Sequence, residues 1–177
     1  MIQDMSTPNI PAVTSLPPGA FSDRVVRDFF IFYAATLVFF AIGIITTLGL
    51  GWYGSLHTPL WTPPELVIAA IWGTLFVTTV LSLSIFCDAQ KEQTRAFRST
   101  VLVYMGNALL ILLWNYLFFG IHQLVPALWA AVVVGVSVLV LILRVKNSSK
   151  AAAWLLAPYL AWVVIAVAIN YAVMLMN

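Results

Sequence analysis

Tryptophans and the residues around them are the part of this sequence best suited to binding a ligand. The 177 residues include seven Trp, six Tyr and eleven Phe. Aromatic side chains often sit at membrane–water interfaces, near the ends of membrane-spanning helices. That explanation suits Trp52, Tyr53, Trp61, Trp129 and Trp154. It suits Trp72, Trp114 and Trp162 less well, because each lies several residues inside an apolar segment and could instead stack on a flat ligand.

Helical spacing groups these inner tryptophans with small or hydrogen-bonding residues. Residues three or four apart share a helix face. Three stripes result: Ala69, Trp72, Phe76 and Thr79; Asn107, Ile111, Trp114 and Phe118; and Tyr159, Trp162, Ala166 and Asn170. Each stripe taken alone is explained by helix packing, with asparagines bonding between helices. The three together favour a shared cavity for a flat, mostly apolar molecule.

The sequence shows no residues arranged for catalysis. The sequence contains no paired-carboxylate, Ser-His-Asp or nucleotide-binding motif, and we assign no catalytic residue. His57 and His122 have no carboxylate or thiolate beside them, and Cys87 is the single cysteine, so we expect no metal site. We also expect no required cofactor.

The composition predicts the elements that position the stripes. Hydrophobic residues make up 63% and charged residues 8% of the chain, against roughly 45–50% and 25% in soluble domains, and the mean hydropathy is +1.03. The lipid bilayer is therefore the expected partner. Nucleic acid is not an expected partner, because the sequence has no basic face. Five segments have about the 20 residues that a membrane-spanning helix needs: 29–51, 66–87, 100–121, 125–143 and 151–176. The expected fold is an all-α membrane protein, a five-transmembrane-helix bundle, with a tight turn at 121–124.

Residues 1–28 differ in kind from the expected membrane domain at 29–177. Four prolines fall among small polar residues without apolar periodicity, which predicts a flexible tail with a short interfacial piece at 21–28. The segment is not expected to be a secretory signal, because Asp4 stands where a basic region should be.

The positive charges predict the orientation. All eight lie on one side of a five-helix topology: Arg24, Arg27, Lys91, Arg95, Arg98, Arg144, Lys146 and Lys150. By the positive-inside rule the N-terminus is cytoplasmic and the C-terminus outside. We expect a bacterial cell membrane, or the mitochondrial outer membrane if the protein is eukaryotic.

Loop 51–65 is aromatic, proline-stiffened and uncharged up to Glu65, and is expected to cover the helix ends as a lid. At its end, Thr62 and Glu65 have the spacing of a capping box, with Pro63 at the first helical position.

Residues from about 30 to the end of the chain resemble the TspO/MBR family, which comprises bacterial tryptophan-rich sensory proteins and the mitochondrial translocator protein, or peripheral-type benzodiazepine receptor. The matching residues are Trp52, Tyr53, Ser55, Leu56, Pro59, Trp61, Pro63 and Pro64; Ile71, Trp72, Gly73, Thr74 and Leu75; Trp114, Phe118, Phe119 and Gly120; and Leu155, Leu156, Pro158, Tyr159, Leu160, Ala161, Trp162, Ala166, Asn170 and Tyr171.

The resemblance implies a five-helix bundle, often a homodimer, that binds porphyrins, sterols and benzodiazepine-site ligands beneath the first loop. In bacterial members, the tryptophans matching Trp72 and Trp162 are tied to light-dependent breakdown of protoporphyrin. The positions matching Ala166 and Asn170 belong to the ligand and sterol region. The expected ligand is a porphyrin, protoporphyrin IX or haem.

Three departures from the family pattern bear on the ligand. Thr58 replaces a lysine that could meet a propionate, which leaves His57 as the nearby substitute. Ile111 replaces an asparagine, with Asn107 one turn earlier on the same face. No Lys or Arg follows Tyr171, so the proposed sterol motif is incomplete, which favours a flat aromatic ligand over a sterol.

The expected function is that of a membrane receptor or carrier for hydrophobic ligands, with a sensory, transport or regulatory role. One alternative is an enzyme that degrades protoporphyrin oxidatively in light, and another is a structural protein whose stripes only pack helices. The candidate ligand-binding residues are Trp52, His57, Trp61, Ala69, Trp72, Phe76, Asn107, Trp114, Phe118, Tyr159, Trp162, Ala166 and Asn170.

Overall fold

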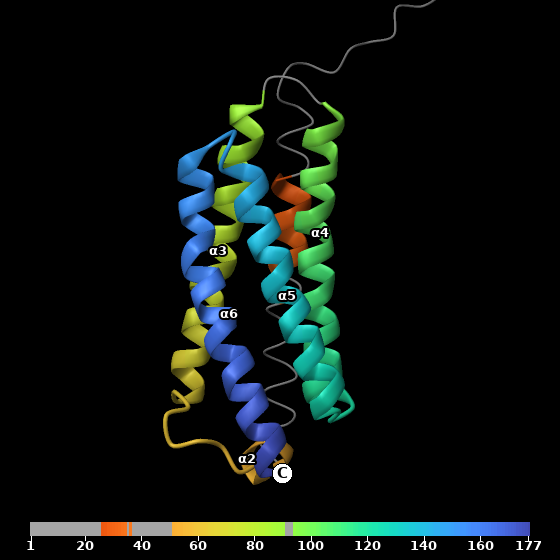
Figure 1. The fold of residues 1–177 in the computed structure, drawn as a ribbon, viewed down its shortest axis with the longest axis vertical. Helices are drawn as coiled ribbons and strands as arrows, with labels where there is room; N and C mark the ends of the chain where they lie inside the picture. The colour runs from red at the N-terminus through yellow and green to blue at the C-terminus, as the bar shows by residue number, and fades with distance from the viewer. Residues whose placement is uncertain (1–25, 35, 37–50, 91–93) are drawn as a thin grey trace, which may run out of the picture.

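A computed structural model describes residues 26–34, 36, 51–90 and 94–177. The regular secondary structure in these ranges consists of helices, joined by turns and loops (Figure 1). A helical run covers 26–34. The elements that follow are α2 (Trp52–Ser55), α3 (Glu65–Ala89), α4 (Arg95–Asn115), the π-helix η1 (Tyr116–Gly120), α5 (Leu124–Val145) and α6 (Lys150–Met176).

Four long helices have the length and apolar composition to cross a bilayer: α3, α4 continued by η1, α5 and α6. They contain 25, 26, 22 and 27 residues, so each reaches across about 30 Å of hydrocarbon. The predicted span at 29–51 lies mostly outside the described residues. Its described part begins at least three residues earlier than predicted, because Val26 already packs against the core while Phe29 and Tyr33 are buried in it.

The four long helices pack side by side, with α6 against α3 and α5, and α5 also against α4 (Figure 1). Many of their outward side chains are large and apolar, including Leu102, Leu139 and Val164. This outer surface suits lipid contact. Gly135 on α5 lies so close to α6 that an added Cβ would meet Val163 Cγ1 at 3.2 Å, which shows how a small residue lets these helices approach.

The predicted tight turn is confirmed, since only 121–123 separate η1 from α5. His122 within it has φ 59°, a left-handed conformation that non-glycine residues seldom adopt. All four long helices extend beyond the predicted apolar segments, and hydroxyl side chains cap the starts of α4 and α6. Thr94 accepts a hydrogen bond from the backbone N–H of Phe97 at the start of α4, and Ser149 accepts one from Ala152 at the start of α6.

The predicted capping box at the start of α3 is wrong. The N-cap is Pro64 and the helix begins at Glu65, with no side-chain hydrogen bond at the cap. The reason is steric, because a residue before proline is disfavoured in the α region and Pro63 therefore cannot begin the helix. The Pro64 carbonyl instead accepts from the backbone N–H groups of Val67 and Ile68. Glu65 does lie in the first turn, where its charge complements the helix dipole.

Asn107 joins four helical segments through its side chain. Its Oδ1 accepts hydrogen bonds from the hydroxyls of Tyr33 at 3.2 Å and Tyr159 at 3.1 Å. Its Nδ2 donates to Ser137 Oγ at 2.8 Å. Since lipid offers no hydrogen-bond partner, buried polar groups in a membrane bundle have to satisfy one another. Asn107 therefore fixes how the segment at 26–34, α4, α5 and α6 sit together.

Candidate ligand-binding site

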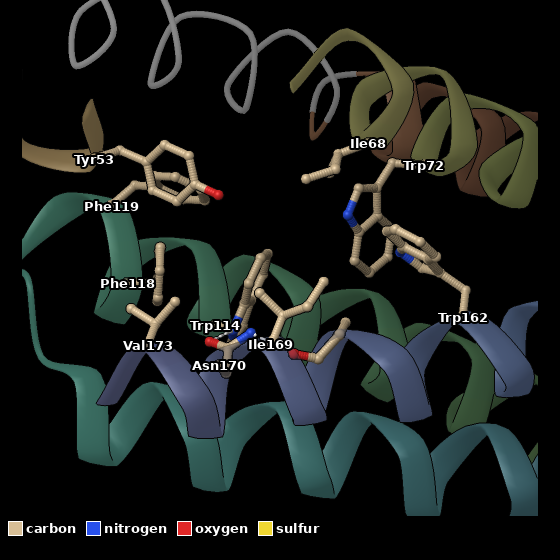
Figure 2. A pocket seen from close by; sticks show the side chains of 11 residues that line it. Tyr53, Ile68, Trp72, Trp114, Phe118, Phe119, Trp162, Ile169, Asn170 and Val173 are labelled. Atoms are coloured by element: carbon tan, nitrogen blue, oxygen red, sulfur yellow. Dashed lines mark hydrogen bonds between the residues drawn. The ribbon is translucent and has the colours of Figure 1, made fainter. Parts of the chain in front are cut away.

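One pocket collects aromatic side chains from α2, α3, α4, η1 and α6 (Figure 2). Its cavity volume is about 50 Å³. The lining residues are Tyr53, Ile68, Trp72, Trp114, Phe118, Phe119, Trp162, Ala166, Ile169, Asn170 and Val173. They are almost wholly aromatic or aliphatic, and none is charged.

All three predicted stripes contribute to this pocket. The predicted candidates that line it are Trp72, Trp114, Phe118, Trp162, Ala166 and Asn170. The indoles of Trp72 and Trp114 stack with ring centroids 5.9 Å apart and an interplanar angle of 29°. Trp114 stacks in turn on Phe118 at 5.7 Å and 22°. The stripes of α3 and of α4 with η1 thus form one aromatic wall.

Three further candidates lie behind this wall. Phe76 is buried between Tyr33 at 4.9 Å and Trp72 at 5.7 Å. Tyr159 meets Trp72 edge-on at 6.2 Å and bonds to Asn107. These two side chains hold Trp72 in place. The hydrogen bonds of Asn107 instead join neighbouring helices. Ala69, on α3, is partly buried and is not among the lining residues.

The remaining candidates belong to loop 51–65 and also lie outside the lining. Trp52 stacks on His122 at 4.0 Å and 17°, and meets Phe118 edge-on at 5.5 Å. The backbone N–H of His57 donates to Asn177 Oδ1, and Asn177 Nδ2 donates to the His57 carbonyl, both at 3.0 Å. Trp61 is 54% exposed. The loop is therefore attached to η1, to the turn before α5 and to the end of α6.

Five lining residues were missing from the predicted set: Tyr53, Ile68, Phe119, Ile169 and Val173. Ile169 and Val173 continue the α6 stripe by one turn, so helical spacing could have identified them. Ile68 lies one turn before Trp72 and follows the same rule. Tyr53 was assigned to the membrane interface, but its ring lies 6.1 Å from Phe118 and 5.8 Å from Phe119.

Phe118 and Phe119 both line the pocket from the π-helix η1. The wider π-turn is closed by a bond from the Ile121 N–H to the Tyr116 carbonyl at 3.0 Å. The two rings pack 4.8 Å apart at 73°. Single-turn π-helices are frequent at functional sites, and here the π-helix carries two rings of the pocket.

The polar groups of the pocket are few. Trp114 Nε1 donates to Asn170 Oδ1 at 3.3 Å, and Asn170 Nδ2 donates to the Ala166 carbonyl at 2.8 Å. Trp162 Nε1 is buried and has no hydrogen-bond partner in the described part of the chain. At the loop end, burial and to a smaller degree the Glu65 carboxylate raise the pKa of Tyr53, so its hydroxyl keeps its proton at neutral pH.

This arrangement can stack flat rings and donate hydrogen bonds. Within the described ranges no three His, Cys, Asp or Glu side chains gather as they would around a metal ion. Apart from the Tyr53 hydroxyl, the lining holds no acid, base or nucleophile of the usual catalytic kinds.

The chain is similar to known proteins of bacteria and mammals. The chain is 28% identical to the tryptophan-rich protein TspO of Bacillus cereus over 147 residues, 83% of this chain and 94% of the relative. It is 27% identical to protein CrtK of Rhodobacter capsulatus over 84% of this chain and 92% of the relative. It is 31% identical to the human translocator protein over 71% of this chain and 74% of the relative.

A sequence profile of the TspO/MBR family matches residues 30–176, which include the four long helices and every residue that lines the pocket. With helices of this length and apolarity, the protein is a multi-pass integral membrane protein. The chain belongs to the TspO/MBR family.

Proposed function

We propose that this protein is a membrane receptor or carrier that binds a flat hydrophobic molecule, a tetrapyrrole such as protoporphyrin IX or haem, in the pocket beneath loop 51–65. The observation that carries the proposal is the meeting of three aromatic stripes, from α3, α4 with η1, and α6, in one pocket. A stack of indole and phenyl rings with no charge suits the face of a macrocycle. Binding of sterols or benzodiazepine-site ligands and assembly as a homodimer stay predictions from the family resemblance.

The pocket has to widen to admit such a ligand. Its cavity of about 50 Å³ is far below the roughly 300–1,000 Å³ of small-molecule sites. The part best placed to move is loop 51–65. It is held by ring contacts of Trp52 with His122 and Phe118, by ring contacts of Tyr53 with Phe118 and Phe119, and by the paired bonds between His57 and Asn177. Its displacement would free Tyr53 from Phe118 and Phe119 and open the pocket at that end.

The binding proposal is tested by titrating the protein in lipid nanodiscs with protoporphyrin IX and following the quenching of tryptophan fluorescence. Saturable quenching with a dissociation constant in the micromolar range or below is expected. Quenching that rises linearly with porphyrin, as in empty nanodiscs, would mean that the aromatic stripes serve helix packing alone.

Asn177→Ala is expected to speed ligand exchange more than it changes affinity. The variant loses both bonds to His57, so the loop opens at a lower cost. It also loses the bond from Asn177 Nδ2 to the Val173 carbonyl, but every side chain of the pocket lining is kept. Each bond contributes about 0.5–1.5 kcal/mol, so the loss of both lowers the cost of opening by about 1–3 kcal/mol, and the association and dissociation rates should both rise roughly 5- to 150-fold. Stopped-flow fluorescence with protoporphyrin measures them. Met176→Ala, at the neighbouring exposed position, is the control and should leave both rates unchanged.

We also infer the orientation in the membrane. The described Lys and Arg residues of α4, α5 and α6 belong to the start of α4, the end of α5 and the start of α6, and these helix ends lie at the end of the bundle opposite α2 and the C-terminus (Figure 1). By the positive-inside rule that end faces the cytoplasm, which puts loop 51–65 outside.

Cysteine labelling of intact cells tests the orientation, in a chain that carries Cys87→Ser. Ser55→Cys should react with a membrane-impermeant maleimide, whereas Asn147→Cys should react only after the membrane is opened. Both positions are exposed, so access to solvent does not separate them. Labelling of position 147 in intact cells would reverse the assignment.

A further inference from the structure

The end of the bundle opposite α2 and the C-terminus, here called the basic end, gathers positive charge. The start of α4, the end of α5 and the start of α6 lie there (Figure 1). These helix ends carry five exposed cations: Arg95, Arg98, Arg144, Lys146 and Lys150. On the four long helices the acidic residue at this end is Asp88, and Lys91 and Glu92, whose formal charges cancel, lie outside the described residues. The surplus of positive charge suits an anionic partner.

Two of these cations flank a serine hydroxyl between α4 and α5. Arg144 Nη1 donates a hydrogen bond to Ser99 Oγ, which joins the last turn of α5 to the second turn of α4. Arg98 precedes Ser99 in the chain and is exposed. Within the described part of the chain neither arginine forms an ion pair, and Ser99 acts only as an acceptor. The Ser99 hydroxyl proton and most of the guanidinium N–H groups are therefore available to an oxyanion.

The basic end has the properties of a headgroup-level surface. The first turn of α4 contains no acidic residue and begins with Arg95. The positive end of a helix dipole disfavours cations, so Arg95 and Arg98 do not stabilise α4 itself. Trp154, near the start of α6, is 76% exposed, as an indole at the level of lipid headgroups is. Phospholipid headgroups are therefore the anions nearest to these cations.

Apolar stripes lead from the two arginines along the helices. By helical spacing Arg98 shares its face of α4 with Leu102 and Leu109, and Arg144 shares its face of α5 with Val133. All three apolar side chains are exposed. The bond from Arg144 to Ser99 fixes the seam between the two helices, and helical spacing puts both stripes on the same side of that seam. Cationic groups at the end of an exposed apolar seam match the charge and shape of an anionic phospholipid.

We propose that Arg98, Ser99 and Arg144 bind the headgroup phosphate of an anionic phospholipid, whose acyl chains lie along the seam between α4 and α5. Guanidinium groups suit this role because their planar N–H pairs bind two phosphate oxygens at once. The surplus of positive charge favours an anionic lipid over a zwitterionic one, whose ammonium group it repels. This site is separate from the pocket beneath loop 51–65 and does not depend on the proposed function.

Native mass spectrometry of the whole chain in uncharged detergent tests the site. The protein is titrated with phosphatidylglycerol, or with phosphatidylcholine of the same acyl chains, and dissociation constants are taken from the lipid-bound fractions. Phosphatidylglycerol should bind more tightly by roughly fivefold for each of the two arginines, the value of one cation near an anionic lipid surface. Glycerol 3-phosphate should not displace it, because this soluble anion makes no contact with the apolar stripes.

Four variants distinguish a specific site from general attraction between charges. Arg98→Gln and Arg144→Gln should each weaken phosphatidylglycerol binding about fivefold. Arg144→Lys keeps the charge but lacks the planar pair of donors, and should still weaken binding roughly two- to tenfold, the value of one net hydrogen bond. Lys146→Gln is the matched control, because it removes the same charge from an exposed position two residues away. It should change the dissociation constant less than about twofold, the scale of a surface substitution.

Equal weakening by Lys146→Gln and the two arginine-to-glutamine variants, or wild-type binding by Arg144→Lys, would show general charge attraction and overturn the site. Equal binding of the two lipids, or displacement of phosphatidylglycerol by glycerol 3-phosphate, would overturn it as well. The substituted side chains are exposed, so all variants should keep the helicity of the wild type. None of them lines the pocket, so protoporphyrin binding should also be unchanged, and the lipid site and the proposed function fail independently.

Discussion

Trp72→Ala should weaken protoporphyrin binding by roughly 10- to 100-fold, which corresponds to about 1–3 kcal/mol for a buried aromatic anchor. Trp72 is 6% exposed and lines the pocket on the α3 side. Its indole is held between Trp114 in front and Phe76 and Tyr159 behind. The ring is therefore already oriented for stacking, and ligand binding costs little conformational entropy at this side chain. Its removal takes away both apolar contact and stacking geometry. The measurement is a porphyrin titration in nanodiscs.

Trp129→Ala is the matched control for this change. Trp129 lies on α5, is 65% exposed and does not line the pocket. Its truncation should alter affinity less than about twofold, the scale of a surface substitution. Trp72→Phe keeps a smaller ring, so its loss of protoporphyrin affinity should lie between those of Trp72→Ala and Trp129→Ala. Helicity measured by circular dichroism has to be equal in all three variants. A loss at Trp129 as large as that at Trp72 would place the ligand on the outer surface of the bundle.

Asn107→Ala should lower the free energy of unfolding by about 2–4 kcal/mol, because two buried tyrosine hydroxyls lose their acceptor and Ser137 loses a donor. For a chain of this size that corresponds to a fall in the unfolding temperature of roughly 5–15 °C. Thermal unfolding in detergent, followed by circular dichroism, measures it.

Asn147→Ala provides the comparison for Asn107, since this asparagine is exposed in the turn between α5 and α6. We expect its unfolding temperature to match that of the wild type. Ligand affinity adds a second distinction, because Asn107 does not line the pocket. Below the melting temperature, Asn107→Ala should bind protoporphyrin within a few-fold of wild type. A strong loss of affinity with unchanged stability would show instead that Asn107 contacts the ligand.

The sequence by itself determined the class of protein and the faces that meet in the pocket. Scarce charges between long apolar segments require a membrane, and the four spans at α3 to α6 follow from the length and apolar composition of these segments. Helical periodicity placed Trp72, Trp114 and Trp162 on inward faces, and the pocket contains all three. These features are local, because the period of a helix and the cost of burying charge depend on the chain within a few turns.

Only the tertiary structure decided what each inward residue does. Asn107 and Trp114 lie on one stripe, yet the first bonds to Tyr33, Tyr159 and Ser137 while the second lines the pocket. Helical periodicity does not predict the π-helix that carries Phe118 and Phe119, nor the bonds between Asn177 and His57. The unpaired N–H of Trp162 is visible only when every neighbouring acceptor is known. The physical reason is that hydrogen-bond partners come from other helices, and a residue's own segment does not specify which helix will stand beside it.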